Sequence, residues 1–145
     1  MEFTVQIPFA EMLGFELISF EAGRSEMALV LRDELTNSFN VAHGGVSMTM
    51  LDVAMAHAAR SPNQPGHPTS PSVVTIEMKT TFMRPGVGRL VCRGNLVHRT
   101  ASMAFCEASM FDAAGLMVAQ ATGTFKYMRG LAVGGKKIER LNASD

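Results

Sequence analysis

The chain has 145 residues, of which 47% are hydrophobic and 18% charged, and its formal net charge is zero. This length and composition predict a single globular domain, residues 1–145, with one hydrophobic core. The balanced charge argues against a nucleic-acid partner and against a charged membrane surface. No apolar run is long enough to span a membrane, and the N-terminus lacks the pattern of a signal peptide, so we expect a cytoplasmic protein.

The first part of the chain predicts one short helix and two strands. Residues 8–14 have the composition of a short helix that ends at Gly14, because glycine readily takes the left-handed conformation that follows a helix. Residues 15–33 contain two runs of strand-like alternation, joined by turn residues at 21–23. We therefore expect two short connected strands before the central part of the chain.

The central segment predicts a long buried helix that contains one carboxylate. Between Val46 and Ala59 apolar residues occupy every side of the helix, which is typical of a buried helix. Asp52 lies in its middle, and no Lys or Arg occurs between Arg32 and Arg60 to neutralise it locally. This aspartate is either a structural residue with a partner distant in sequence or a functional group.

The rest of the chain predicts a proline-rich connection, four strands and a loose tail. Four of the six prolines fall in residues 60–72, a connection longer than is usual in compact domains. The strand patterns cover residues 72–83, 89–98, 102–112 and 116–128, or three strands if one pair merges. Residues 129–145 form a loose polar tail, so the core is expected within residues 10–128.

The first of these strands predicts two distinct faces. Its alternation places Val74, Ile76, Met78 and Phe82 on one face and Glu77, Lys79 and Thr81 on the other. One helix cannot cover both faces of a large sheet. The economical arrangement is a long antiparallel sheet curled around the helix, an α+β fold.

Two cysteines, Cys92 and Cys106, fall in strand-like segments. We expect two buried thiols in a reducing compartment. The alternative is a disulfide between them.

Two glycines, Gly44 and Gly45, stand at the beginning of the central helix. Because glycine inside a helix costs about 1 kcal/mol relative to alanine, we expect both at the helix start. Backbone N–H groups lack internal partners there, and the helix dipole favours negative charge. The pair is either a turn that needs a positive φ or a site that polarises a carbonyl oxygen.

A carboxylate combined with amide donors suits the hydrolysis of an activated ester, and of a thioester in particular. A thiol leaving group has a pKa of roughly 8.5, so it can depart as a thiolate without a strong general acid. The sequence has no G-x-S-x-G elbow, and its four histidines do not have metal-ligand spacing. We therefore expect neither a metal nor another cofactor.

These residues together resemble a known family. The "HGG" at 43–45, with an acid nine residues after the histidine, precedes the strand "VTIEMKTTFMRPG" at 74–86 and three hairpin-linked strands. This order resembles the hotdog-fold acyl-CoA thioesterases. The most similar group is the phenylacetate-pathway PaaI type, with the 4-hydroxybenzoyl-CoA thioesterases that carry the catalytic acid on the central helix. The resemblance covers about residues 10–128 and implies a hotdog fold, a curled antiparallel sheet wrapped around one long helix.

The resemblance implies roles for five residues. Asp52 matches the catalytic carboxylate, which acts as general base on water or as nucleophile, and the Gly44 backbone N–H matches the donor to the thioester oxygen. His43 matches the histidine that closes the loop before the helix. Asn37 matches an asparagine that orients substrate or water, and Thr75 a serine or threonine that faces the attacking water. As alternatives, Asn37 is only a turn residue and Thr75 only a strand residue.

The family also implies coenzyme A, whose phosphates need surface cations. Arg84, Arg99 and Lys136 or Lys137 are candidates, and we take Arg84 and Gly45 as substrate-binding positions. The acyl group is not readable, because a methionine-rich wall accepts aromatic and aliphatic chains alike. Two other functions remain as alternatives: a non-catalytic acyl-CoA-binding hotdog protein, and a hotdog hydratase or dehydratase of acyl thioesters.

Helix geometry adds an expectation about assembly. Gly44 and Asp52 are eight residues apart, which separates them by roughly 12 Å along one helix. One helix therefore cannot easily supply both groups to one substrate, whereas two antiparallel helices in a two-fold dimer can. We expect a homodimer with shared active sites, and the resemblance implies two such dimers joined into a homotetramer.

Overall fold

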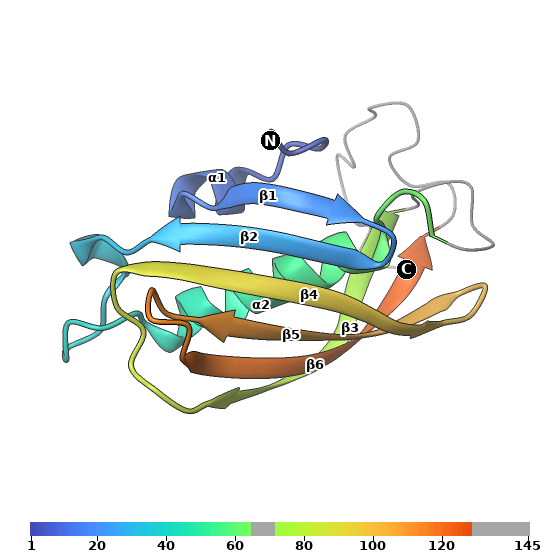
Figure 1. Ribbon diagram of the computed structural model, residues 1–145. Helices are drawn as coiled ribbons and strands as arrows, with labels where there is room; N and C mark the ends of the chain where they lie inside the picture. The colour runs from blue at the N-terminus through green and yellow to red at the C-terminus, as the bar shows by residue number, and fades with distance from the viewer. Residues whose placement is uncertain (65–71, 129–145) are drawn as a thin grey trace, which may run out of the picture.

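The computed structural model describes residues 1–64 and 72–128, and its elements follow the predicted order (Figure 1). The elements are α1 (Pro8–Leu13), β1 (Glu16–Glu21), β2 (Arg24–Val30), η1 (Asp33–Leu35), α2 (Gly44–Ala59), β3 (Ser72–Phe82), β4 (Arg89–Arg99), β5 (Met103–Phe111) and β6 (Met117–Met128). Only the 3-10 turn η1 has no counterpart in the sequence pattern. The predicted tail and most of the proline-rich connection lie outside the described residues.

The two helices begin and end as the local sequence predicts. Gly14 takes a φ of 85° after α1, and its N–H donates to the carbonyls of Ala10 and Glu11. At the start of α2, the side chain of His43 accepts a hydrogen bond from the Gly45 N–H. Both glycines of the pair are therefore in the first turn of α2, as expected.

The six strands form one antiparallel sheet in the order β1-β2-β4-β5-β6-β3. Strand β3 follows α2 in the chain but pairs with β6, so it forms the edge opposite to β1. The sheet curls around α2, and this confirms the predicted α+β hotdog fold, with four separate strands after the helix.

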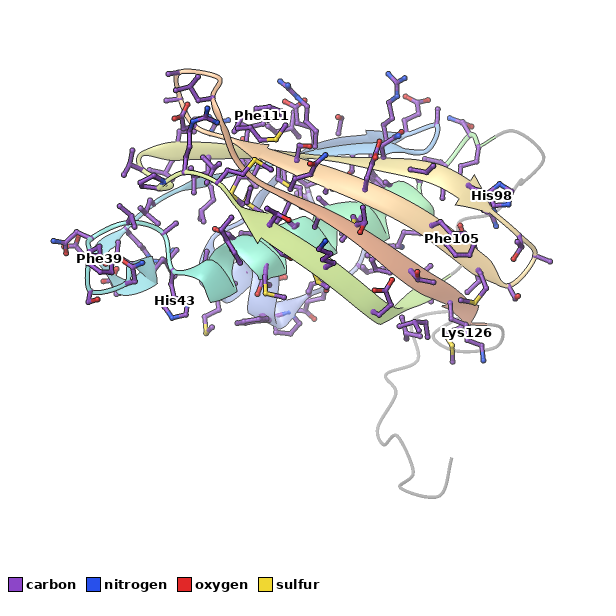
Figure 2. All side chains as sticks on the ribbon, turned by 90° about the horizontal axis from the view of Figure 1, so that it is seen from below. Phe39, His43, His98, Phe105, Phe111 and Lys126 are labelled. Carbon is purple, nitrogen blue, oxygen red and sulfur yellow. The ribbon has the colours of Figure 1, made fainter. Side chains whose placement is uncertain are left out.

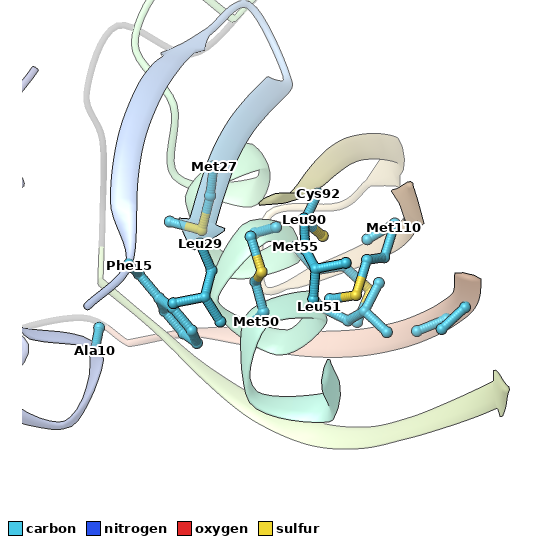
Figure 3. Close-up of a cluster of buried hydrophobic side chains, with 14 of the residues drawn as sticks. Ala10, Phe15, Met27, Leu29, Met50, Leu51, Met55, Leu90, Cys92 and Met110 are labelled. Carbon is cyan, nitrogen blue, oxygen red and sulfur yellow. The ribbon is translucent and has the colours of Figure 1, made fainter. Parts of the chain in front are cut away.

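The core fills the space between α2 and the curled sheet. Figure 3 shows Met50, Leu51 and Met55 of α2 among side chains from β2, β4 and β5. The largest of these are fully buried: Met27, Leu29, Leu90, Cys92 and Met110. Cys92 and Cys106 are buried free thiols, as expected. Neither helix in the described part of the chain is long and apolar enough to cross a membrane.

The predicted faces of β3 are partly wrong. Thr75 pairs with Phe125 and Glu77 with Thr124, so the register shifts between them and β3 contains an extra residue, a β-bulge. Val74 pairs with exposed Lys126, whereas Met78 pairs with buried Gly123. Because residues paired across an antiparallel sheet share a face, Val74 and Met78 lie on opposite faces, not on the same one.

Candidate active site

The aspartate of α2 has its partner on the edge strand β3. The Thr75 hydroxyl donates a hydrogen bond to Asp52 Oδ1 across 2.7 Å. The helix supplies the carboxylate from one side, and the edge strand supplies the hydroxyl from the other. The structure therefore brings together two of the predicted site residues, which are far apart in the sequence.

Burial changes the proton affinity of this carboxylate. The pKa of Asp52 is raised above its usual value, chiefly because burial disfavours the charged form, while the Thr75 hydrogen bond acts in the opposite direction. In the described part of the chain, Asp52 forms no ion pair with any Lys, Arg or His side chain. A half-buried carboxylate of raised pKa is a better proton acceptor than a solvated one.

The first turn of α2 leaves one backbone N–H group available. His43 Nδ1 accepts from the Gly45 N–H at 2.9 Å, and the Val46 N–H donates to the His43 carbonyl. Among residues 1–64 and 72–128, no acceptor is found for the Gly44 N–H. Since the Gly45 N–H is already bonded, Gly44 is the donor that the helix start leaves available to a ligand.

Asn37 belongs to the loop that leads into α2. Its Oδ1 accepts from the N–H groups of Phe39 (2.9 Å) and Val41 (3.4 Å), which is the pattern of an Asx turn. This oxygen therefore stabilises the loop, and only the side-chain NH₂ of Asn37 remains available to a ligand. Figure 2 shows Phe39 and His43 at the end of the molecule where α2 begins, far from His98, Phe105 and Lys126.

Strand β3 runs alongside α2 and contacts it at two places, near Asp52 and near Gly44. Thr75 meets Asp52, while the Phe82 ring lies over Gly44, where an added Cβ would be 3.4 Å from the ring. The strand is therefore antiparallel to the helix. The predicted residues divide into an amide group around Gly44 and a carboxylate group around Asp52, roughly 12 Å apart along α2.

A pocket of about 430 Å³ opens beside Asp52 and Thr75. It continues along α2 toward the helix C-terminus, between the helix, the first residues of β3 and the N-terminal segment. Its other lining residues are Val5, Ile7, Val53, Ala56, His57, Arg60, Ser72, Val73 and Val74. The walls are mostly apolar, so the pocket can accept an acyl chain whose carbonyl lies at Asp52.

The sequence reasoning did not find two residues of this pocket, His57 and Arg60. His57 is 1% exposed, its Nδ1 is 2.8 Å from the Val53 carbonyl oxygen, and burial lowers its pKa to about 4. Arg60 ends α2, and burial lowers its pKa as well. The available signal was spacing, because Asp52, Ala56 and Arg60 follow each other at intervals of four on one side of the helix.

The cations predicted for coenzyme A are dispersed. Arg84 is exposed, and its guanidinium donates to the Met117 carbonyl at 2.7 Å. Arg99 donates to Gln64 and lies over the Tyr127 ring. Lys136 and Lys137 lie outside the described residues. No group of three or more His, Cys, Asp or Glu side chains suited to a metal ion occurs in residues 1–64 and 72–128.

Sequence comparison gives one family match and two similar curated proteins. Residues 39–130 match the model of the thioesterase superfamily. A candidate esterase of Saccharolobus solfataricus is 27% identical over 120 residues, which are 82% of this chain and 82% of that protein. A candidate esterase of Halobacterium salinarum is 26% identical over 126 residues, 81% of this chain and 82% of that protein.

Solved structures show the same fold. A conserved protein of Pseudomonas aeruginosa superposes with a TM-score of 0.76 at 27% identity, covering 85% of this chain and 95% of that one. A mutant of the phenylacetic acid degradation protein PaaI of Thermus thermophilus superposes with a TM-score of 0.72 at 27% identity. The match covers 84% of this chain and 100% of that one. The PaaI protein of the E. coli phenylacetic acid degradation operon superposes with a TM-score of 0.75 at 20% identity, and the match covers 83% of both chains.

Proposed function

The chain belongs to the thioesterase superfamily, whose chemistry is thioester hydrolysis, and we propose that its substrates are acyl-CoA thioesters, with Asp52 as the catalytic carboxylate. The observation that carries this proposal is the Asp52–Thr75 pair. A carboxylate of raised pKa lines a mostly apolar pocket, 2.7 Å from a hydroxyl that orients it. The products are a free acid and coenzyme A.

As a general base, Asp52 takes a proton from a water molecule held between its carboxylate and the thioester carbonyl. The hydroxide that forms attacks the carbonyl carbon, and the electrons of the C=O bond move to the oxygen. When the tetrahedral intermediate collapses, the C–S bond breaks and the thiolate leaves without a general acid, since its pKa is roughly 8.5. As a nucleophile, Asp52 attacks the same carbon, the C–S bond breaks as the thiolate leaves, and water then cleaves the resulting anhydride.

The negative charge on the carbonyl oxygen requires a donor, and we assign this role to the Gly44 N–H. A Cβ at this position would already be in van der Waals contact with the Phe82 ring, at 3.4 Å, so a larger side chain would obstruct the incoming carbonyl. His43 supports the donor indirectly, because it engages the neighbouring Gly45 N–H and fixes the first turn of α2. Asn37 shapes the loop that leads into α2. Arg84 and Gly45 remain substrate-binding candidates at the surface.

The separation of Gly44 from Asp52 supports a homodimer in which each site takes its amide from one subunit and its carboxylate from the other. Within residues 1–64 and 72–128, the outer edge of the 11-residue strand β3 pairs with no other strand, and such edges invite pairing. Exposed apolar side chains lie along it and on the adjacent side of α2: Met48, Val74, Ile76, Phe82 and Met83. Pairing of two β3 edges would cover them. By family resemblance, two such dimers form a tetramer.

A panel of acyl-CoA thioesters, assayed for release of free thiol, tests the proposed function. We expect the wild type to hydrolyse members of the panel and Asp52→Asn to lose roughly 10²-fold or more in kcat, as for the removal of a general base. Asp33→Asn, the same substitution at an exposed residue of η1, is the matched control and should retain activity.

Stability separates a catalytic from a structural role for Asp52. Because its pKa is raised in the folded state, the ionised carboxylate lowers stability at neutral pH, and the neutral asparagine removes this cost. Asp52→Asn should therefore be at least as stable as the wild type in thermal unfolding. Unchanged turnover would remove Asp52 from the mechanism. Tight binding of acyl-CoA by a wild type that releases no thiol would instead indicate a binding protein.

A further inference from the structure

The pocket beside Asp52 has a second charged residue at its far end. Asp52 and Arg60 are two turns apart on α2, roughly 12 Å along the helix axis, and both line the pocket. Between them the wall is mostly apolar, formed by Val53, Ala56 and Val73 together with the ring of His57. The pocket therefore has a carboxylate at one end, a guanidinium at the other and hydrocarbon in between.

Arg60 is half-buried without a counter-charge in the described part of the chain. Its guanidinium has no ion pair and no hydrogen bond to any residue in 1–64 or 72–128, and no ion pair joins it to Asp52. Arginine stays protonated at neutral pH even when burial lowers its pKa. A partly desolvated cation of this kind is an attractive partner for an anionic group of a ligand.

The neighbouring histidine does not share this charge. His57 lies between Asp52 and Arg60 on the helix, and its pKa of about 4 keeps it neutral near pH 7. The rings of Phe3 and Phe20 pack edge-on against it at centroid distances of 5.3 and 5.4 Å. Among the described lining residues, Arg60 is consequently the sole cation.

We propose that Arg60 binds an anionic group at the far end of the acyl chain, so that the preferred substrates are CoA thioesters of dicarboxylic acids. This rests on the proposed function, because the thioester carbonyl must lie at Asp52. The planar guanidinium can take a carboxylate through two parallel hydrogen bonds, while the methylene groups contact Val53, Ala56 and Val73.

Matched pairs of substrates test the assignment. Adipoyl-CoA and hexanoyl-CoA have the same six-carbon chain and differ in the terminal carboxylate, and pimeloyl-CoA and heptanoyl-CoA form a second pair. We expect the wild type to favour the dicarboxylic member by about tenfold or more in kcat/KM. Arg60→Gln should remove this preference, because it lowers kcat/KM selectively for the dicarboxylic member of each pair. Arg93→Gln, at an exposed arginine of β4, controls for the change in net charge and should retain the preference.

The alternative is that Arg60 only complements the dipole at the C-terminus of α2. In that case Arg60→Gln lowers the unfolding temperature and affects both members of each pair equally, which overturns the proposal. Arg60→Lys keeps a cation at the helix end. Partial retention of the preference by this variant supports the assignment, and a loss confined to the dicarboxylic substrates shows that the guanidinium fork is needed.

Binding separates this proposal from the hydrolysis itself. Calorimetry on Asp52→Asn should show tighter binding of adipoyl-CoA than of hexanoyl-CoA, and the Asp52→Asn/Arg60→Gln variant should bind both equally. If the wild type hydrolyses no substrate but this difference in binding is found, the proposed function fails and the role of Arg60 stands. If the wild type hydrolyses the neutral thioesters equally well and Arg60→Gln changes no ratio, the role of Arg60 fails alone.

Discussion

At the scale of single residues, burial favours the uncharged form of two titratable side chains on α2. It raises the pKa of Asp52 and lowers that of His57 to about 4. The two residues nevertheless differ in access. Asp52 is only partly buried and has a hydroxyl partner, while His57 is 1% exposed and its Nε2 has no hydrogen-bond partner within the described ranges. Asp52 is therefore suited to proton transfer, and His57 to packing.

The low pKa of His57 predicts a pH-dependent stability. Between about pH 4 and 6.5 the unfolded chain protonates this histidine while the folded chain does not, so stability rises with pH across that window and falls on acidification. The contribution is at most roughly 3 kcal/mol. His57→Asn keeps a donor for the Val53 carbonyl and should flatten this part of the profile in chemical denaturation.

The same substitution at an exposed position provides the control for this experiment. His98 is exposed and stacks on Phe105 at 6.0 Å between ring centroids. His98→Asn therefore shows how much of any change in the pH profile comes from the substitution itself. Identical profiles for His57→Asn and the wild type would show that His57 is not held neutral by the fold.

At the scale of elements, the close packing of α2 on β4 holds the helix that carries Asp52 in place. The Ser25 hydroxyl on β2 donates to the Ala54 carbonyl in the middle of the helix, at 2.6 Å. Gly94 on β4 lies directly against the same helix, because an added Cβ would clash with the Ala54 carbonyl oxygen and reach 2.6 Å from Ser25 Oγ. Asp52 is two residues from this contact, so a shift of the helix would move it relative to Thr75.

Gly94→Ala tests the importance of this contact. The extra methyl group must displace either the helix or the strand, so we expect a loss of roughly 1–3 kcal/mol in unfolding free energy. Val97→Ala, at an exposed position of the same strand, should change stability by only about 0.5 kcal/mol. A fully stable Gly94→Ala protein would mean that α2 is not held at a fixed distance from the sheet.

Elements with local signals were predictable, and contacts between distant elements were not. The glycine pair and the carboxylate in an apolar run marked Gly44 and Asp52, because caps and periodicity are properties of adjacent residues. The bulge at Ile76 is set by pairing with β6, so alternation alone assigned the faces of β3 incorrectly. Likewise, the position of Arg60 in the pocket depends on β3 and the N-terminal segment, which local patterns do not relate to the helix.

At the scale of the whole molecule, the two parts of the proposed site are too far apart to serve one substrate within one chain. The amide at Gly44 and the carboxylate at Asp52 are roughly 12 Å apart along α2, whereas the attacking atom must come within about 3–3.5 Å of the carbonyl carbon. Strand β3 borders both parts and has the free edge at which a second chain could pair. The same surface would then account for assembly and for catalysis.

Mixing two inactive variants tests the shared site. Asp52→Asn removes the carboxylate and Gly44→Val obstructs the amide, so each variant alone should be inactive. After the two are unfolded and refolded together, each mixed dimer contains one site with both defects and one with neither. If the chains pair at random, about one quarter of the wild-type activity per site should return. Mixed dimers that form without activity, or an active monomer isolated by gel filtration, would show instead that each chain carries a complete site.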